Sequence, residues 1–113
     1  MALVLVIDQS FDSLVYLSEL FETKGIECRL ATSWKMALEH LLIESFDFIL
    51  CEHCMDEGDA FWFLRHLKAL KTSSRYIVMS DDMRIKKKIP LENFTIGFCS
   101  KPICWDDLWG EMQ

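Results

Sequence analysis

The sequence predicts an α/β fold in which five strands form one parallel sheet with helices on both faces. Two observations carry this prediction. The first is a pair of apolar runs, Leu3–Ile7 and residues 46–51, which are typical of strands covered on both faces. The second is that strand-like runs alternate with stretches of helical spacing along the 113 residues. This alternation favours right-handed crossovers and a doubly wound sheet.

The first half of the chain predicts two strand–helix units. After the first run, Ser10 or Asp12 is placed to cap a helix that ends at Gly25. The residues of this helix that recur at helical spacing are Leu14, Leu17, Leu20 and Phe21. A short strand over residues 27–30 follows, and Ser33 then caps a second helix. Its expected inward side consists of Ala37, Leu38, Leu41 and Leu42.

The second half repeats the pattern. It predicts a helix over residues 60–71, strands over 75–79 and 95–99, and a last helix over 105–112. The expected inward residues of the first of these helices are Phe61, Leu64, Leu67 and Leu70. Another helix begins near Asp82 and is cut short by Pro90, because proline lacks an amide N–H and clashes with the preceding turn.

Composition and charge limit the function classes. Hydrophobic residues make up 51% and charged residues 27%, which are globular values, and the length suits a single domain over residues 1–113. The net charge of −6 has the wrong sign for nucleic-acid binding through phosphate neutralisation. The apolar run at residues 2–7 is too short to span a membrane and lacks the flanks of a signal peptide. Five cysteines, an odd number, argue against a disulfide framework, so we expect a cytoplasmic protein with reduced thiols.

Polar residues follow four of the predicted strands. Asp8 follows the first strand, Glu52 the third, Ser80 the fourth and Lys101 the fifth. Because the carboxyl ends of parallel strands meet at one edge of the sheet, where such folds bind ligands, these side chains are expected to converge on one pocket.

Over essentially its whole length the chain resembles response-regulator receiver domains. The resemblance lies in residues 5–8 (LVID), 46–55 (FDFILCEHCM), 61–67 and 77–80 (IVMS), and in Lys101-Pro102. It implies a flavodoxin-like fold with strand order 2-1-3-4-5. It also implies phosphoryl transfer from a histidine kinase to an aspartate after the third strand, aided by a divalent metal on an acidic pair after the first.

The resemblance assigns roles to individual residues. Asp8 matches the first member of the acidic pair, while Ser80 and Lys101 match the hydroxyl and the lysine that contact the new phosphate. Phe98 matches the aromatic switch position.

Two positions depart from the family pattern. Glu52 replaces the phosphoacceptor aspartate, and its carboxylate lies more than about 1 Å farther out, a misplacement that can cost roughly 10²-fold in rate. Gln9 replaces the second acidic residue with a neutral amide, which Mg²⁺ binds less well than a carboxylate. We therefore interpret Asp8, Gln9, Glu52, Ser80 and Lys101 as a degenerate phosphorylation site, with no catalytic residue and with Mg²⁺ binding weak or absent.

Glu52 has two interpretations. As a permanent mimic of the phosphorylated state it would be partial, because it supplies one negative charge where a phosphate carries about −1.5 to −2. Alternatively, Glu52 forms a half-buried ion pair with Lys101 that holds the degenerate site together.

Cys51 and Cys54 flank Glu52 and His53 and suggest a metal or redox site. Structural zinc sites usually pair two short motifs, and the spacing of Cys99 and Cys104 does not supply a second one. Cys51 ends an apolar strand, which favours a small buried hydrophobic residue.

Trp105 and Trp109 lie four residues apart, on one side of the last helix. One interpretation is core packing. The other is a docking surface, because helix 4, strand 5 and helix 5 form the usual partner face of receivers and aromatic residues are enriched at interface hot spots.

The sequence therefore predicts a stand-alone pseudo-receiver that signals by protein–protein interaction, independently of phosphorylation, and is not an enzyme. Its expected partner is a sensor kinase or an output protein, with no nucleic acid and no membrane, and the helix 4, strand 5 and helix 5 face could also form a homodimer. One alternative is a weakly active phosphoacceptor in a two-component phosphorelay, using Glu52 or Asp56. Another is a thiol or metal sensor that uses Cys51 and Cys54.

Overall fold

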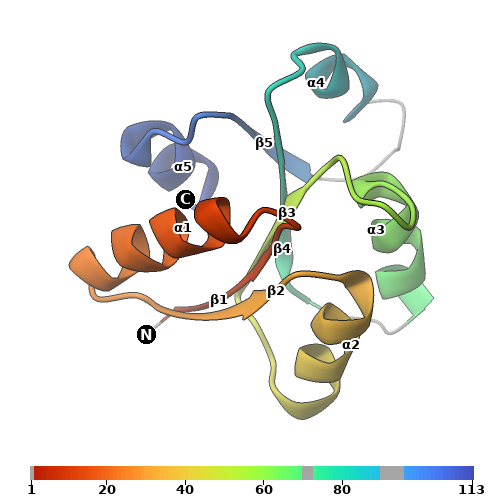
Figure 1. Cartoon of the computed structure of the whole chain (residues 1–113), viewed down its shortest axis with the longest axis horizontal. Helices are drawn as coiled ribbons and strands as arrows, with labels where there is room; N and C mark the ends of the chain where they lie inside the picture. Colours follow the sequence, from red (N-terminus) through yellow and green to blue (C-terminus); the bar gives the residue numbers. More distant parts are fainter. Residues whose placement is uncertain (1, 70–72, 90–95) are drawn as a thin grey trace.

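Five parallel strands form one sheet in the order β2-β1-β3-β4-β5 (Figure 1), which confirms the predicted fold class and strand order. The structure is a computed structural model that describes residues 2–69, 73–89 and 96–113. The strands are β1 (Leu3–Ile7), β2 (Glu27–Ala31), β3 (Phe48–Glu52), β4 (Arg75–Ser80) and β5 (Ile96–Ser100). The helices are α1 (Phe11–Thr23), α2 (Trp34–Ile43), α3 (Ala60–Ala69), α4 (Arg84–Lys88) and α5 (Trp105–Glu111).

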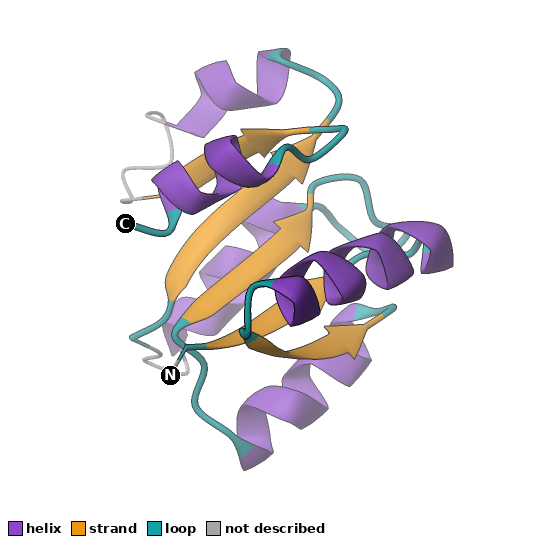
Figure 2. Cartoon of the chain, turned by 90° about the vertical axis from the view of Figure 1, so that its left-hand side faces the viewer, coloured by secondary structure: helices purple, strands orange, loops and turns teal. Residues whose placement is uncertain are grey.

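Helices cover both faces of the sheet. α1 and α5 lie on one face, and α2, α3 and α4 lie on the other (Figures 1 and 2). Successive side chains of a strand point to opposite faces, and β1 serves both: Val4 and Val6 join the core under α1 and α5, whereas Leu5 and Ile7 join the core under α2 and α3. This double burial explains why β1 is an unbroken aliphatic run.

Side-chain caps fix the starts of the first two helices. The Ser10 hydroxyl oxygen accepts the Ser13 amide N–H at 3.3 Å, so Ser10, and not Asp12, caps α1. Ser33 caps α2 in the same way through the Met36 amide at 3.2 Å, as predicted. After α1 the chain turns at Gly25, whose φ of 70° suits a residue without a side chain.

The prediction that Leu42 faces inward is wrong. Leu42 is 78% exposed and its neighbour Ile43 is 81% exposed. The buried stripe of α2 is centred on Trp34 and Ala37, and the 100° advance per residue places Leu42 about 110° from its centre. The apolar residue type of Leu42 suggests burial, but its helical phase places it at the side of α2, away from the buried residues.

Strand boundaries differ from the prediction by one or two residues. β3 begins at Phe48 and not at residue 46, β2 extends to Ala31, and β4 and β5 each extend by one residue, to Ser80 and Ser100. The predicted positions of Leu70, Pro90 and Thr95 lie outside the described residues. No helix in the described part of the chain has the length and apolar character needed to cross a bilayer.

Leucines at the two extremes of burial test this packing. Leu17 of α1 is fully buried against the sheet, so Leu17→Ala should lower the free energy of unfolding by about 2 to 5 kcal/mol. The loss comes from the lost burial and from the cavity that the substitution leaves. Leu42→Ala should change it by less than about 0.5 kcal/mol, since the side chain is already in water. Urea unfolding of both variants checks this, and a large loss for Leu42→Ala would contradict the exposed position.

Candidate functional site

Four strands deliver their terminal polar residues to one edge of the sheet. Asp8, Glu52, Ser80 and Lys101 lie at the carboxyl ends of β1, β3, β4 and β5, as the parallel topology requires. Asp8 and Ser80 are each only 1% exposed. The structure thus brings the residues that the sequence singled out to a single, largely dry location.

Lys101 is the centre of this cluster. Its Nζ lies 2.7 Å from Asp8 Oδ2, 2.7 Å from Glu52 Oε1 and 3.3 Å from Ser13 Oγ. An ammonium group has three N–H donors, so these three acceptors complete its hydrogen bonding. Burial alone would lower the pKa of Lys101, but the hydrogen bonds to Asp8 and Glu52 outweigh burial and raise that pKa above its ordinary value.

Backbone amides bind the remaining carboxylate oxygens. Asp8 Oδ1 accepts the Ser10 N–H at 2.9 Å, and Glu52 Oε2 accepts the Cys54 N–H at 3.1 Å. Each of the four oxygens of the two carboxylates therefore has an N–H donor within hydrogen-bonding distance. The chain itself therefore supplies one donor to every oxygen of the two carboxylates.

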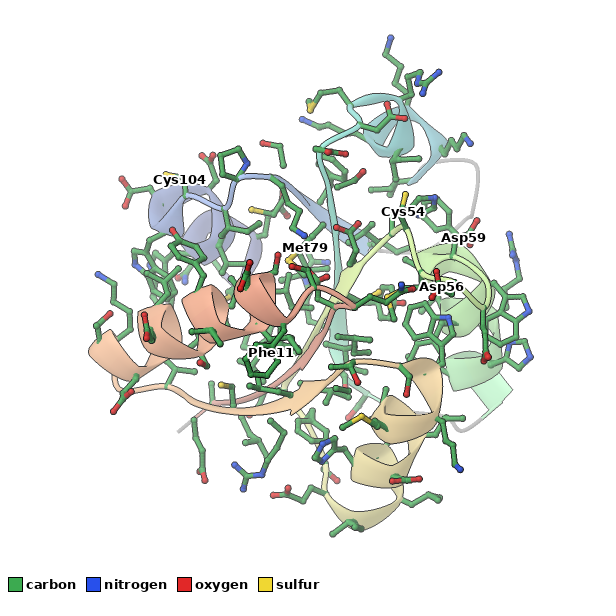
Figure 3. All side chains as sticks on the ribbon, viewed as in Figure 1. Phe11, Cys54, Asp56, Asp59, Met79 and Cys104 are labelled. Carbon is green, nitrogen blue, oxygen red and sulfur yellow. The ribbon has the colours of Figure 1, made fainter. Side chains whose placement is uncertain are left out.

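Gln9 lies outside the Lys101 cluster. Its side-chain oxygen accepts the amide N–H of Asp56, which joins the β1–α1 loop to the β3–α3 loop. Gln9 and Asp56 also line a cavity of about 270 Å³ together with Trp34 at the start of α2. Figure 3 shows Asp56, with Cys54 and Asp59, along the β3–α3 loop.

Ser80 and Phe98 do not extend the hydrogen-bond network of Glu52. The Ser80 hydroxyl oxygen accepts the Asp82 amide N–H at 3.0 Å, and within the described residues no hydrogen bond joins it to Glu52. Phe98 is 8% exposed and packs in the core under α3 and α4. The charge of Glu52 is directed to Lys101 and not to the hydroxyl after β4.

The thiols near Glu52 are held in their protonated form. Cys51 is fully buried and its Sγ lies 3.0 Å from the hydroxyl of Tyr76; burial raises the Cys51 pKa. The pKa of Cys54 is raised by partial burial and by acidic neighbours, Glu52 first among them. Because the thiolate is the reactive and metal-binding form, both environments oppose redox or metal chemistry. Among the described residues no group of three His, Cys, Asp or Glu side chains is arranged to hold a metal ion.

The tryptophans of α5 face α1 and not α4. The Trp105 ring meets Phe21 edge-on at a centroid distance of 6.1 Å, and Lys24 Nζ lies 5.2 Å from its centroid. Trp109 stacks on Trp105 at 5.6 Å. The side of α5 toward α4 instead carries Asp107 and Glu111. The predicted location of Trp105 and Trp109 on the helix 4, strand 5 and helix 5 face is therefore wrong, because a spacing of four shows that two residues share a side without showing which neighbour that side meets.

Two contributors to the charged cluster were missed by sequence reasoning, and a buried histidine lies beside it in the chain. Ser13 and the Cys54 amide bind the charged cluster, and neither a lone serine nor a backbone N–H leaves a sequence signal. His53 is 7% exposed, and its Nδ1 has no hydrogen-bond partner among the described residues. Its place after Glu52 was noted only as part of a cysteine motif.

Comparison with known proteins places the fold. No family model matches the chain. The transcriptional regulatory protein ZraR of Escherichia coli K12 is 26% identical over 111 residues, which are 97% of this chain and 25% of ZraR. The chain thus spans about a quarter of the length of the curated relatives it matches.

Solved structures agree closely in shape. The chemotaxis protein CheY4 of Vibrio cholerae has a TM-score of 0.87 at 20% identity, covering 100% of this chain and 97% of that one. A two-component response regulator of Clostridium difficile has a TM-score of 0.87 at 20% identity, covering 98% and 92%. The chain therefore has the fold of response-regulator receiver domains.

Removal of the ammonium should destabilise the protein. Lys101→Met leaves Asp8 and Glu52 side by side without a cation, and loss of one partner of a buried charge pair costs about 3 kcal/mol or more. The free energy of unfolding in urea at pH 7 measures this. Lys24→Met is the matched control, because within the described residues the Lys24 amine contacts the Trp105 ring face and no carboxylate.

A comparison of the wild type with Lys101→Met should also show a pH dependence of stability. The pKa of Lys101 is raised on folding, so its contribution is complete below the unfolded pKa of about 10.4 and is lost as pH rises through the folded value. The stability difference between wild type and Lys101→Met should be constant from about pH 7 to 9 and shrink above about pH 10.5. The buried thiols and Tyr76 titrate in both proteins, so the difference isolates Lys101.

Proposed function

We propose that this chain is a receiver-like signalling domain of the cytoplasm that acts by binding another protein and does not depend on phosphorylation. The observation that supports this most directly is the position of Lys101, whose ammonium binds Asp8 and Glu52 at 2.7 Å each. The two residues on which the family's chemistry depends are thereby held by the chain itself.

The geometry at Glu52 opposes phosphoryl transfer. A nucleophilic carboxylate needs an oxygen free to approach the phosphorus in line. Oε1 of Glu52 accepts from Lys101 and Oε2 accepts from the Cys54 amide, so both oxygens are already held in place by donors of the chain, and Lys101 lowers the charge available for attack. The longer side chain adds a displacement of more than about 1 Å from the position of an aspartate carboxylate.

These hydrogen bonds also favour one of the two interpretations of Glu52. A mimic of the phosphorylated state would direct its charge toward the hydroxyl of Ser80, but that hydroxyl oxygen accepts from Asp82. The contacts support Glu52 as a structural anchor for Lys101.

The divalent metal that the fold family implies does not fit the residues present. Asp8 is the only acid at the end of β1, and both of its oxygens already accept N–H donors. Gln9 offers a neutral amide oxygen, which is engaged by Asp56. A Mg²⁺ ion would have to share these oxygens with the ammonium of Lys101, whose positive charge repels the metal and already compensates the carboxylates.

Mg²⁺ should therefore bind with a dissociation constant above about 1 mM, which corresponds to less than about 4.1 kcal/mol of binding free energy. Isothermal titration calorimetry measures this directly. Lys101→Met removes the ammonium from both carboxylates and should bind Mg²⁺ more tightly than the wild type does. Submillimolar binding by the wild type would contradict the prediction that Lys101 competes with the metal.

The surface of α4, β5 and α5 is a candidate for self-association. A cavity of about 250 Å³ lies there between Lys86 of α4 and the carboxylates Asp107 and Glu111 of α5. Two copies related by a two-fold axis could set the basic wall of each against the acidic wall of the other. A homodimer through this face is the second part of the proposal, beside a sensor kinase or output protein as the partner.

Incubation with acetyl phosphate and Mg²⁺, followed by intact-mass measurement, tests phosphorylation independence. The wild type should show no added phosphoryl group. Glu52→Asp should gain it slowly, and Glu52→Asp combined with Gln9→Asp should gain it faster, because a shorter carboxylate and a second acid restore the family pattern. Rapid uptake by the wild type would overturn the proposal and favour the weakly active phosphoacceptor.

A further inference from the structure

α2 carries apolar side chains on its outer side as well as on its inner side. The inner ones pack in the core and are Trp34, Ala37, Leu38 and Leu41. Three more point outward: Leu42 is 78% exposed, Ile43 is 81% exposed and Met36 is 39% exposed. A helix at a protein surface has polar residues on its outer side, whereas a helix that is apolar all round is buried. The composition of α2 is therefore that of a helix whose outer side is also covered.

We call the set Met36, Glu39, Leu42 and Ile43 the outer face of α2. Met36 and Ile43 are two helical turns apart, so their side chains lie in line along the helix, separated by about 10 Å. Glu39 lies between them, one turn from each and one turn from Leu42. One carboxylate is thus surrounded by three exposed apolar side chains, and exposed apolar patches on a protein surface mark sites of interaction.

The outer face of α2 lies apart from the surfaces described above. α2 joins two parallel strands and runs in the opposite direction to them, so its last residues lie near the amino edge of the sheet. The Lys101 cluster lies at the carboxyl edge. Figure 1 shows the end of α2 at the opposite end of the molecule from α4. A partner on this face therefore contacts neither Glu52 nor the cavity between α4 and α5.

The charges around the outer face of α2 favour a cationic partner. Glu39 is exposed, and among the described residues no cation is paired with it, Lys35 on the first turn included. The other nearby cation, Arg29, is engaged by Glu27 and by Glu44.

The end of α2 also lacks donors. Within the described part of the chain, the carbonyl groups of residues 41–43 accept no hydrogen bond, and no glycine turn follows the helix. These carbonyls form the negative end of the helix dipole, one turn from Glu39. Basic side chains of a partner satisfy both the carboxylate and the carbonyl end.

The neighbouring sheet edge is closed to an added strand. β2 is the edge strand beside α2. Its Cys28 carbonyl accepts Nη1–H of Arg29 at 3.3 Å, and its Leu30 carbonyl accepts Nε2–H of His40 at 3.0 Å. A partner strand needs free backbone groups along such an edge. The occupant therefore contacts the side chains of α2, and a helix offers apolar and basic residues at the matching spacing.

We infer that the outer face of α2 binds a cationic amphipathic helix of another protein. Apolar residues of that helix cover Met36, Leu42 and Ile43, and its arginines or lysines pair with Glu39 and with the carbonyl end of α2. The inference rests on the proposed function in taking the chain to be a protein-binding module, and it adds a surface separate from the one between α4 and α5.

The test uses a defined probe. A synthetic peptide of about 14 residues carries leucines on one helical side and arginines on the other. One control peptide carries glutamates in place of the arginines, and a second has the same composition as the arginine peptide in an order without helical periodicity. Calorimetry with the full chain, without any phosphodonor, should show the arginine peptide binding at least about 10-fold more tightly than either control. No binding of the arginine peptide, or equal binding of all three, would overturn the inference.

Two pairs of variants locate the surface. Ile43→Ser should weaken arginine-peptide binding by about 10-fold or more. Met83→Ser, which replaces an exposed apolar side chain just before α4, should leave it unchanged. Glu39→Lys should weaken binding several-fold and Glu19→Lys, on α1, should not. All four side chains are exposed, so the variants should fold, which circular dichroism checks. Equal losses within either pair would contradict the location.

Sedimentation of the chain alone tests for a second copy as the occupant. If the chain self-associates and Ile43→Ser makes it monomeric, a second copy covers the outer face of α2 and the inference of a cationic partner is wrong. Uptake of phosphate in the acetyl phosphate experiment would overturn the proposed function without affecting peptide binding at the opposite edge of the sheet, so the two failures are distinguishable.

Discussion

The ammonium group of Lys101 is the interaction on which the carboxyl edge of the sheet depends. It joins the ends of β5, β1 and β3 and the first turn of α1 through three hydrogen bonds. Two carboxylates that are 2% and 14% exposed would repel each other without it. The low polarity of the surroundings strengthens both the attraction to Lys101 and the penalty for its loss. The amides of Ser10 and Cys54 then complete the hydrogen bonding of the same carboxylates, so the loops after β1 and β3 depend on the charge cluster as well.

The molecule therefore has a sheet edge whose charges are paired and, on the two sides of α5, two surfaces of different chemistry. At the edge, the chain satisfies its own charges. On one side of α5, Asp107 and Glu111 face the basic α4; on the other, Trp105 and Trp109 face α1. A short amphipathic helix therefore presents acids to one neighbour and rings to another.

The sequence was sufficient for those features that follow from periodicity and chain topology. The five strands and the convergence of Asp8, Glu52, Ser80 and Lys101 follow from alternation and from parallel strands that end at one edge. The cap Ser33 follows from its side-chain chemistry, which for the first helix left Ser10 and Asp12 both open. The rotation of α5 did not follow, because spacing sets the relative positions of side chains on a helix but not the direction in which the helix turns them. The exposure of Leu42 was missed for a different reason, since its apolar residue type outweighed its helical phase in the prediction. The roles of Ser13 and the Cys54 amide depend on distances across the fold, which no local pattern encodes.

The alternation of β1 continues past the strand end and has a consequence for how this segment tolerates change. Val4, Val6 and Asp8 all point toward α1, whereas Leu5 and Ile7 point toward α2 and α3, and Gln9 contacts the β3–α3 loop. An exchange of one aliphatic residue for another of similar volume preserves this order. A deleted residue in β1 would bring the neutral Gln9 opposite Lys101 and move Asp8 to the buried place of Ile7. An inserted residue would bring Ile7 opposite Lys101 and move Asp8 to the place of Gln9. The segment from β1 to Gln9 should therefore tolerate conservative aliphatic substitutions but not insertions or deletions.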